Sequence, residues 1–134
     1  MEMTIESIRG YIVKEEVFEP NSTIIQEGKR GDWVYIILKG RVKVKKCVQR
    51  KTVTIDTLEE GDVVGEMVMF KESGGLRTAS VIADGEVRMG ILDRERLEME
   101  YELLSPQLKS LIRNLVLRLE ETTRKASLLA FGEF

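Results

Sequence analysis

A series of short apolar or alternating segments, separated by Gly and Asp, fills residues 17–92 and constrains the fold more than any other feature. The segments that we expect to form strands are 34–38, 41–45, 52–58, 79–83 and 87–92. Turns are expected at Lys39-Gly40 and at Asp84-Gly85, because both dipeptides separate two such segments. Strands this short and this regularly spaced predict an antiparallel β jelly roll, also called a double-stranded β-helix.

Helical periodicity occurs at both ends of the chain. Ile5, Ile8 and Ile12 recur at helical spacing and predict a short N-terminal helix. Asp93 is a suitable N-cap for a further helix, and Pro106 is well placed to open a long one of roughly 36 Å that ends near residue 130. We therefore expect one domain over residues 1–134, with the N-terminal helix at about 1–15, the jelly roll at 16–92 and helices at 93–134.

The long C-terminal helix carries residues spaced alternately four and three apart, at the a and d positions of a heptad repeat. This stripe consists of Leu108, Ile112, Leu115, Leu119, Thr122, Ala126 and Leu129. A stripe of three heptads is typical of a coiled-coil seam, so we predict a homodimer through residues 107–130. The alternative is a single amphipathic helix that covers its own sheet. Thr122 and its neighbour Thr123 place two hydroxyl groups where a seam normally has large apolar side chains.

Composition excludes several classes of site. The chain has no histidine, which excludes His-ligated cupin metal sites and haem sensing through an axial His, so we expect no metal. No paired acid–base constellation with a poised nucleophile stands out, so we expect no enzymatic activity. Cys47 is the single cysteine, and neither a secretory signal nor a membrane-spanning run is present. These features predict a cytoplasmic protein without membrane association.

Nucleic-acid binding finds little support in the charge distribution. The formal net charge is −2, so the chain lacks a global basic signature. Basic residues cluster within 39–51, where Arg41, Lys43 and Lys45 alternate with valines. This alternation favours the solvated outer face of a strand, and a phosphate-contacting patch is the alternative. Because the chain stops at Phe134, just past the long helix, we expect no direct nucleic-acid binding.

Two short motifs on either side of a polar loop are suited to a small anionic ligand. They are Gly65-Glu66-Met67 and Arg77-Thr78. The Arg77 guanidinium can bind a phosphate bidentately, and Thr78 adds a hydroxyl donor beside it. Gly65 permits a close backbone turn, and the amides after it, including that of Met67, can form an anion-binding concavity. Glu66 would repel a phosphate, so its carboxylate suits a hydroxyl; a structural Glu66–Arg77 ion pair is the alternative.

These two motifs, in this order on a β-rich chain that ends in a long helix, resemble the phosphate-binding cassette of the cyclic nucleotide-binding domains. The resemblance covers nearly the whole chain and is greatest to the sensor domains of the bacterial catabolite activator and fumarate-nitrate regulator superfamily. It implies that Glu66 accepts a hydrogen bond from a ribose hydroxyl and that Arg77 binds the cyclic phosphate. It also implies the remaining contacts to the base. The hydroxyls of Thr122 and Thr123, one from each subunit, would form hydrogen bonds with the adenine, and Val44, Ile55 and Val64 would form a base pocket.

The resemblance implies a regulatory module that binds a cyclic nucleotide and signals through a dimer helix to a partner or an output domain. The two threonines favour cAMP, because adenine offers an exocyclic amine to hydroxyl acceptors. The ligand cGMP stays possible, because Thr78 beside Arg77 also occurs in cGMP-binding relatives. Two alternatives stay open: a jelly-roll dimerisation module without a ligand, and the sensor half of a transcription regulator that responds to another small anion.

Overall fold

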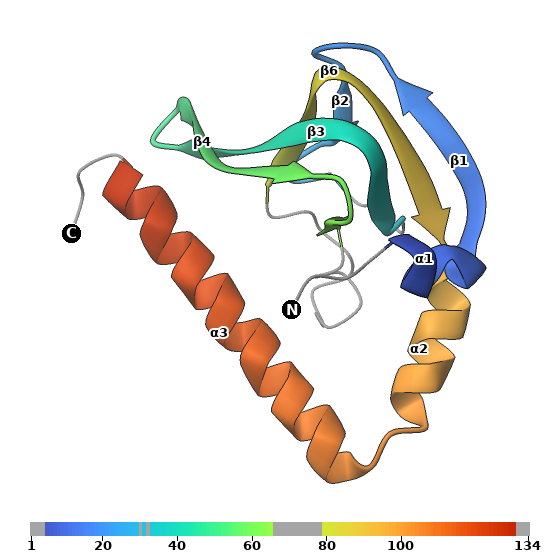
Figure 1. The fold of residues 1–134 in the computed structure, drawn as a ribbon. Helices are drawn as coiled ribbons and strands as arrows, with labels where there is room; N and C mark the ends of the chain where they lie inside the picture. Colours follow the sequence, from blue (N-terminus) through green and yellow to red (C-terminus); the bar gives the residue numbers. More distant parts are fainter. Residues whose placement is uncertain (1–4, 30, 32, 66–78, 131–134) are drawn as a thin grey trace.

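The computed structural model describes residues 5–29, 31, 33–65 and 79–130. Figure 1 shows a curved β sheet with helices at both ends of the chain. The helices are α1 (Ile5–Ile8), the 3-10 turn η1 (Arg9–Tyr11), α2 (Arg94–Glu102) and α3 (Pro106–Ala130). The strands are β1 (Ile12–Phe18), β2 (Thr23–Ile25), β3 (Tyr35–Val48), β4 (Lys51–Glu59), β5 (Val63–Val64) and β6 (Ser80–Leu92).

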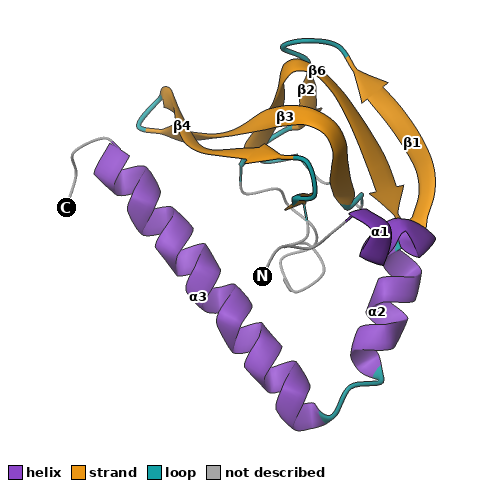
Figure 2. Cartoon of the chain, in the orientation of Figure 1, coloured by secondary structure: helices purple, strands orange, loops and turns teal. Residues whose placement is uncertain are grey.

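All strand pairs are antiparallel, which confirms the predicted fold class. The sheet has the order β1-β6-β3-β4, with β2 paired to β6 and β5 paired to β3. Strands that are distant in sequence are therefore neighbours, as in a jelly roll. Figure 2 shows α2 beside α1 at one end of the sheet, while α3 runs past the end formed by β3 and β4.

Strand β3 contributes to two apolar clusters, because successive side chains of a strand point to opposite faces. Tyr35 and Ile37 lie in the main core with residues of β6, whereas Ile36 lies in a second cluster with Ile8 of α1. Both faces of β3 are buried here, which explains why residues 34–38 are apolar without interruption.

The predicted turns at Lys39-Gly40 and Asp84-Gly85 are wrong as chain reversals. Each lies inside one long strand, β3 or β6, and the two strands pair with each other. The register passes from Lys39↔Arg88 to Arg41↔Asp84, so both strands bend at the same place. Gly40 and Gly85 have positive φ angles of 95° and 81°, which L side chains rarely adopt. The glycines therefore mark a shared corner of the sheet rather than chain reversals.

The N-terminal helical segment is shorter than expected. The helix α1 and the turn η1 end at Tyr11, whereas the prediction extended to about residue 15. Residues 12–18 instead form β1, which pairs with the last part of β6 from Ile12↔Leu92 onward. The backbone N–H and C=O groups of this segment form hydrogen bonds with β6. The helical spacing of three isoleucines gives no sign of this distant partner.

The C-terminal helices begin where the sequence predicted. The Asp93 side chain accepts a hydrogen bond of 3.2 Å from the Arg96 N–H and caps α2. Ser105 Oγ accepts one of 3.1 Å from the Leu108 N–H at the start of α3. The helix α3 contacts β4 and β3. Much of its apolar surface is nevertheless exposed, including Leu115 at 54%.

A candidate ligand cavity between α3 and the sheet

A cavity of about 890 Å³ lies between the sheet and the second half of α3. Its sheet side is mostly apolar, and its helix side comes from residues 117–126. The apolar side chains of the sheet side are Ile25, Val44, Ile55, Leu58, Val63, Val64, Ala79 and Val81. A half-open cavity with an apolar wall and a few polar groups is typical of a small-molecule site.

The three residues expected to form the base pocket all line this cavity. Val44 comes from β3, Ile55 from β4 and Val64 from β5. Val64 is buried, whereas Val44 and Ile55 are half-buried and keep surface available to a ligand. The structure thus brings together three positions that are separated by up to 20 residues in the sequence.

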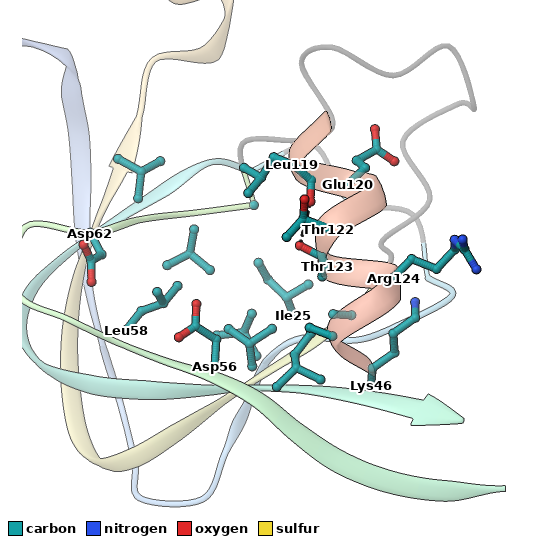
Figure 3. A pocket seen from close by; sticks show the side chains of 18 of the residues that line it. Ile25, Lys46, Asp56, Leu58, Asp62, Leu119, Glu120, Thr122, Thr123 and Arg124 are labelled. Carbon is teal, nitrogen blue, oxygen red and sulfur yellow. Dashed lines mark hydrogen bonds between the residues drawn. The ribbon is translucent and has the colours of Figure 1, made fainter. Parts of the chain in front are cut away.

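The two threonines of α3 form part of the opposite wall. Thr122 and Thr123 line the cavity from α3, and Figure 3 shows both on the side of the helix that faces the sheet. Thr123 Oγ1 donates a hydrogen bond of 2.9 Å to the Leu119 carbonyl oxygen, while Thr122 is exposed. A hydroxyl that donates to its own helix still has lone pairs with which to accept.

The cassette itself is described only at its ends. Glu66, Met67, Arg77 and Thr78 lie outside the described residues. Gly65 and Ala79, the described residues on either side of this segment, both line the cavity. Gly65 has a φ of 82°, which agrees with the predicted need for glycine at this turn. The two described residues that flank 66–78 in the sequence therefore both lie at the cavity wall.

Charged side chains that sequence reasoning missed also line the cavity. Lys46 of β3 lies 3.9 Å from a carboxylate oxygen of Glu27, and Arg124 of α3 pairs with Glu121. The pKa of the Glu121 carboxyl lies below its ordinary value, because the Arg124 guanidinium donates hydrogen bonds to it. Lys46 shares a strand face with Val44 two residues earlier, so its place in the cavity follows from simple alternation.

Asp56 was missed because a β-bulge changes the alternation of β4. The β3–β4 register passes from Val44↔Asp56 to Lys45↔Thr54, which leaves Ile55 without a partner residue. Ile55 and Asp56 consequently both line the cavity, although adjacent residues of a regular strand face opposite sides. No local sequence pattern marks this bulge.

Comparison with known proteins places this chain in a family. The sequence profile of the cyclic nucleotide-binding domain matches residues 15–102, which is most of the chain. The chain belongs to the cyclic nucleotide-binding domain family. Membership confirms the resemblance inferred from the cassette motifs, and it makes the domain a nucleotide-sensing, regulatory type of module.

The relatives of this domain include channels and transcription regulators. It is 32% identical over 114 residues to human cyclic nucleotide-gated channel beta-1, covering 84% of this chain and 9% of the channel. It is 30% identical over 115 residues to the cAMP-activated global transcriptional regulator CRP of Pasteurella multocida, covering 85% of this chain and 54% of the regulator. The domain thus spans about half of the regulator and a small part of the channel.

Solved structures of similar fold carry nucleotides. The cAMP-bound form of the EAL enzyme Bd1971 has a TM-score of 0.76 and 27% identity, and the match covers 89% of this chain and 31% of that one. Its cGMP-bound form has a TM-score of 0.73 and 29% identity, covering 84% and 30%. In both structures the match covers less than a third of the larger chain.

The described residues contain neither a metal-binding cluster nor a membrane-spanning helix. Within residues 5–29, 31, 33–65 and 79–130, His, Cys, Asp and Glu side chains form no group of three that could hold a metal ion. In the same part of the chain, no helix combines the length and the apolar character needed to cross a membrane.

Proposed function

We propose that this domain senses cAMP and transmits the binding event through α3. The observation that carries the proposal is the composition of the cavity: Val44, Ile55 and Val64 line one side, Thr122 and Thr123 line the other, and Gly65 leads into the cassette. The sequence resemblance alone also indicates each of these residues as a ligand contact. Relatives named for cAMP activation and structures with bound cAMP or cGMP support a cyclic nucleotide as the ligand.

The proposed roles divide the ligand into three parts. Arg77, with Thr78 and the backbone amides that follow Gly65, including that of Met67, binds the cyclic phosphate, because a guanidinium matches two phosphate oxygens. Glu66 accepts a hydrogen bond from the ribose hydroxyl. The flat base lies on the apolar sheet side and reaches the hydroxyls of α3. This arrangement binds and releases a ligand without chemical change, so we propose a binding module without catalysis.

Thr122 is the proposed reader of adenine on α3. Replacement of Thr122 by valine keeps the shape and removes the hydroxyl, so we expect cAMP binding to weaken about fivefold to tenfold, as the loss of one hydrogen bond implies. Binding of cGMP should weaken less than about twofold. Calorimetric titration of both nucleotides measures the difference. Thr54→Val, on an exposed part of β4, is the matched control. Equal weakening of both nucleotides by Thr122→Val would remove the case for adenine readout.

We also propose that α3 forms a homodimer through residues 107–130. Leu115 belongs to the a/d stripe, is 54% exposed and does not line the cavity. An aspartate there would bury a charge in the seam, so Leu115→Asp should weaken dimerisation at least about 100-fold. Sedimentation over a range of concentrations measures this change. Leu103→Asp, at an 85% exposed position between α2 and α3, should leave the association unchanged. A wild-type chain that sediments as a monomer would contradict the proposal.

A last part of the proposal concerns the compartment and the partners of the domain. We propose that the domain works in the cytoplasm, does not contact nucleic acid itself and signals to a partner or an output domain. The exposed thiol of Cys47, the single cysteine, suits a reducing compartment. Within the basic cluster, Arg41 pairs with Asp84 at 3.0 Å and Lys46 with Glu27 at 3.9 Å, which supports a structural rather than a phosphate-binding role.

A further inference from the structure

We propose that Asp56 determines base specificity by accepting a hydrogen bond from the exocyclic amino group of adenine. The proposal rests on the proposed function, because it assigns one more contact to the same ligand. It starts from an unusual feature of the cavity: the sheet side is mostly apolar, and Asp56 places a carboxylate there beside Val44, Ile55 and Leu58. The other charged residues on this side are Lys46 and Asp62.

A local distortion puts the carboxylate there. In a regular strand, Asp56 would face away from its neighbour Ile55 and leave the cavity. The bulge at Ile55 removes this constraint, and Asp56 lies directly opposite Val44 of β3 in the register. Bulges commonly re-aim side chains beside functional sites. Asp56 is exposed, so neither core packing nor burial requires a carboxylate at this position.

The carboxylate retains capacity for a ligand. Oδ1 accepts a hydrogen bond of 2.8 Å from the Thr57 backbone N–H, which fixes the orientation of the side chain. Oδ2 takes part in no hydrogen bond or ion pair with any residue of the described ranges. An ionised carboxylate can only accept hydrogen bonds, so its partner must be a donor. The group is therefore oriented and has an acceptor oxygen available toward the cavity.

The helix side of the cavity, opposite Asp56, supplies hydroxyl groups for the same edge of the base. Figure 3 shows Asp56 extending from β4 toward the space that Thr122 and Thr123 face from α3. A purine between these walls presents its polar edge to the carboxylate and to the hydroxyls. Adenine carries an amino group with two N–H donors on this edge, one for Asp56 and one for a threonine. Guanine carries the O6 acceptor at the same ring position, and a carboxylate repels it.

Asp56→Asn tests the proposal with little change in shape. The asparagine amide both donates and accepts, so it tolerates O6 of guanine as well as the adenine amino group. We expect the cAMP-to-cGMP affinity ratio to fall at least about tenfold relative to wild type, the factor that corresponds to about 1.4 kcal/mol. Competition calorimetry with both nucleotides measures the ratio. Glu86→Gln, which removes one negative charge at an exposed position outside the cavity, should leave the ratio unchanged.

Asp56→Ser provides a second variant, because a serine hydroxyl can still accept from the Thr57 N–H. It should lower cAMP affinity, and loss of the carboxylate should remove the repulsion of guanine O6, so the cAMP-to-cGMP affinity ratio should fall again. A wild-type ratio in both Asp56 variants would overturn the inference and leave the proposed function standing. A larger loss for cGMP than for cAMP would also overturn it, since Asp56 would then accept from guanine donors. A wild-type protein that binds neither nucleotide would overturn the proposed function and this inference together.

Discussion

Replacement of Arg77 by alanine is expected to weaken cAMP binding at least about 100-fold and to leave the proposed α3-mediated dimer intact. The reason is that a guanidinium offers a fixed charge and two parallel N–H donors to the cyclic phosphate. A loss of about 2.7 kcal/mol corresponds to this factor and lies within the range for a hydrogen bond to a charged group. Titration calorimetry measures the affinity, and sedimentation measures the dimer.

Two further variants make the Arg77 result specific. Arg77→Lys keeps the positive charge but loses the two parallel N–H donors, so its affinity for cAMP should lie between those of wild type and Arg77→Ala. Arg50→Ala removes an exposed cation from the β3–β4 turn, outside the cavity, and should leave binding unchanged. Unchanged cAMP affinity in Arg77→Ala would refute the phosphate role and favour a structural ion pair with Glu66.

Gly40→Ala is expected to destabilise the fold by at least about 3 kcal/mol. Two effects add at this position. The φ of 95° is unfavourable for alanine, and a Cβ atom would lie 2.6 Å from the Glu86 carbonyl oxygen and 3.2 Å from Val87 Cα. Both are backbone atoms of β6 and cannot rotate away. Urea unfolding monitored by circular dichroism measures the free energy of unfolding of the variant against wild type.

Gly85→Ala separates the steric clash with β6 from the cost of placing alanine at a positive φ angle. Gly85 has a similar φ of 81°, but a Cβ atom there has nothing within 4 Å. This variant should lose only about 1–2 kcal/mol, the cost of a left-handed alanine. Equal destabilisation by both substitutions would show that close approach of β3 and β6 at the corner contributes nothing.

The fold class was predictable because strand and helix periodicities are local signals. Asp93 and Pro106 marked the starts of α2 and α3 correctly, since capping and proline effects act within one turn. The corner at Gly40 and Gly85 was not predictable. In the sequence, a glycine of a hairpin turn cannot be distinguished from a glycine at a bend that two paired strands share. The pairing of β1 with β6 was missed because it joins residues that are about 70 to 80 positions apart, whereas periodicity is a local signal.

The candidate site shows the same division. Val44, Ile55, Val64, Thr122 and Thr123 were assigned through the resemblance, and the cavity brings all of them together. Asp56 could not be assigned, because its orientation depends on a bulge fixed by the β3–β4 register. The roles of Glu66, Met67, Arg77 and Thr78 stay predictions, since these residues lie outside the described part of the chain.

Binding of a cyclic nucleotide by the wild-type chain is the central claim, and titration calorimetry with cAMP and cGMP tests it most directly. The account predicts saturable binding of both, with cAMP the tighter ligand, and a rise in the thermal midpoint at saturating nucleotide because the ligand binds the folded state. The absence of both heat and thermal shift with either nucleotide would contradict it and would favour a jelly-roll dimerisation module without a ligand.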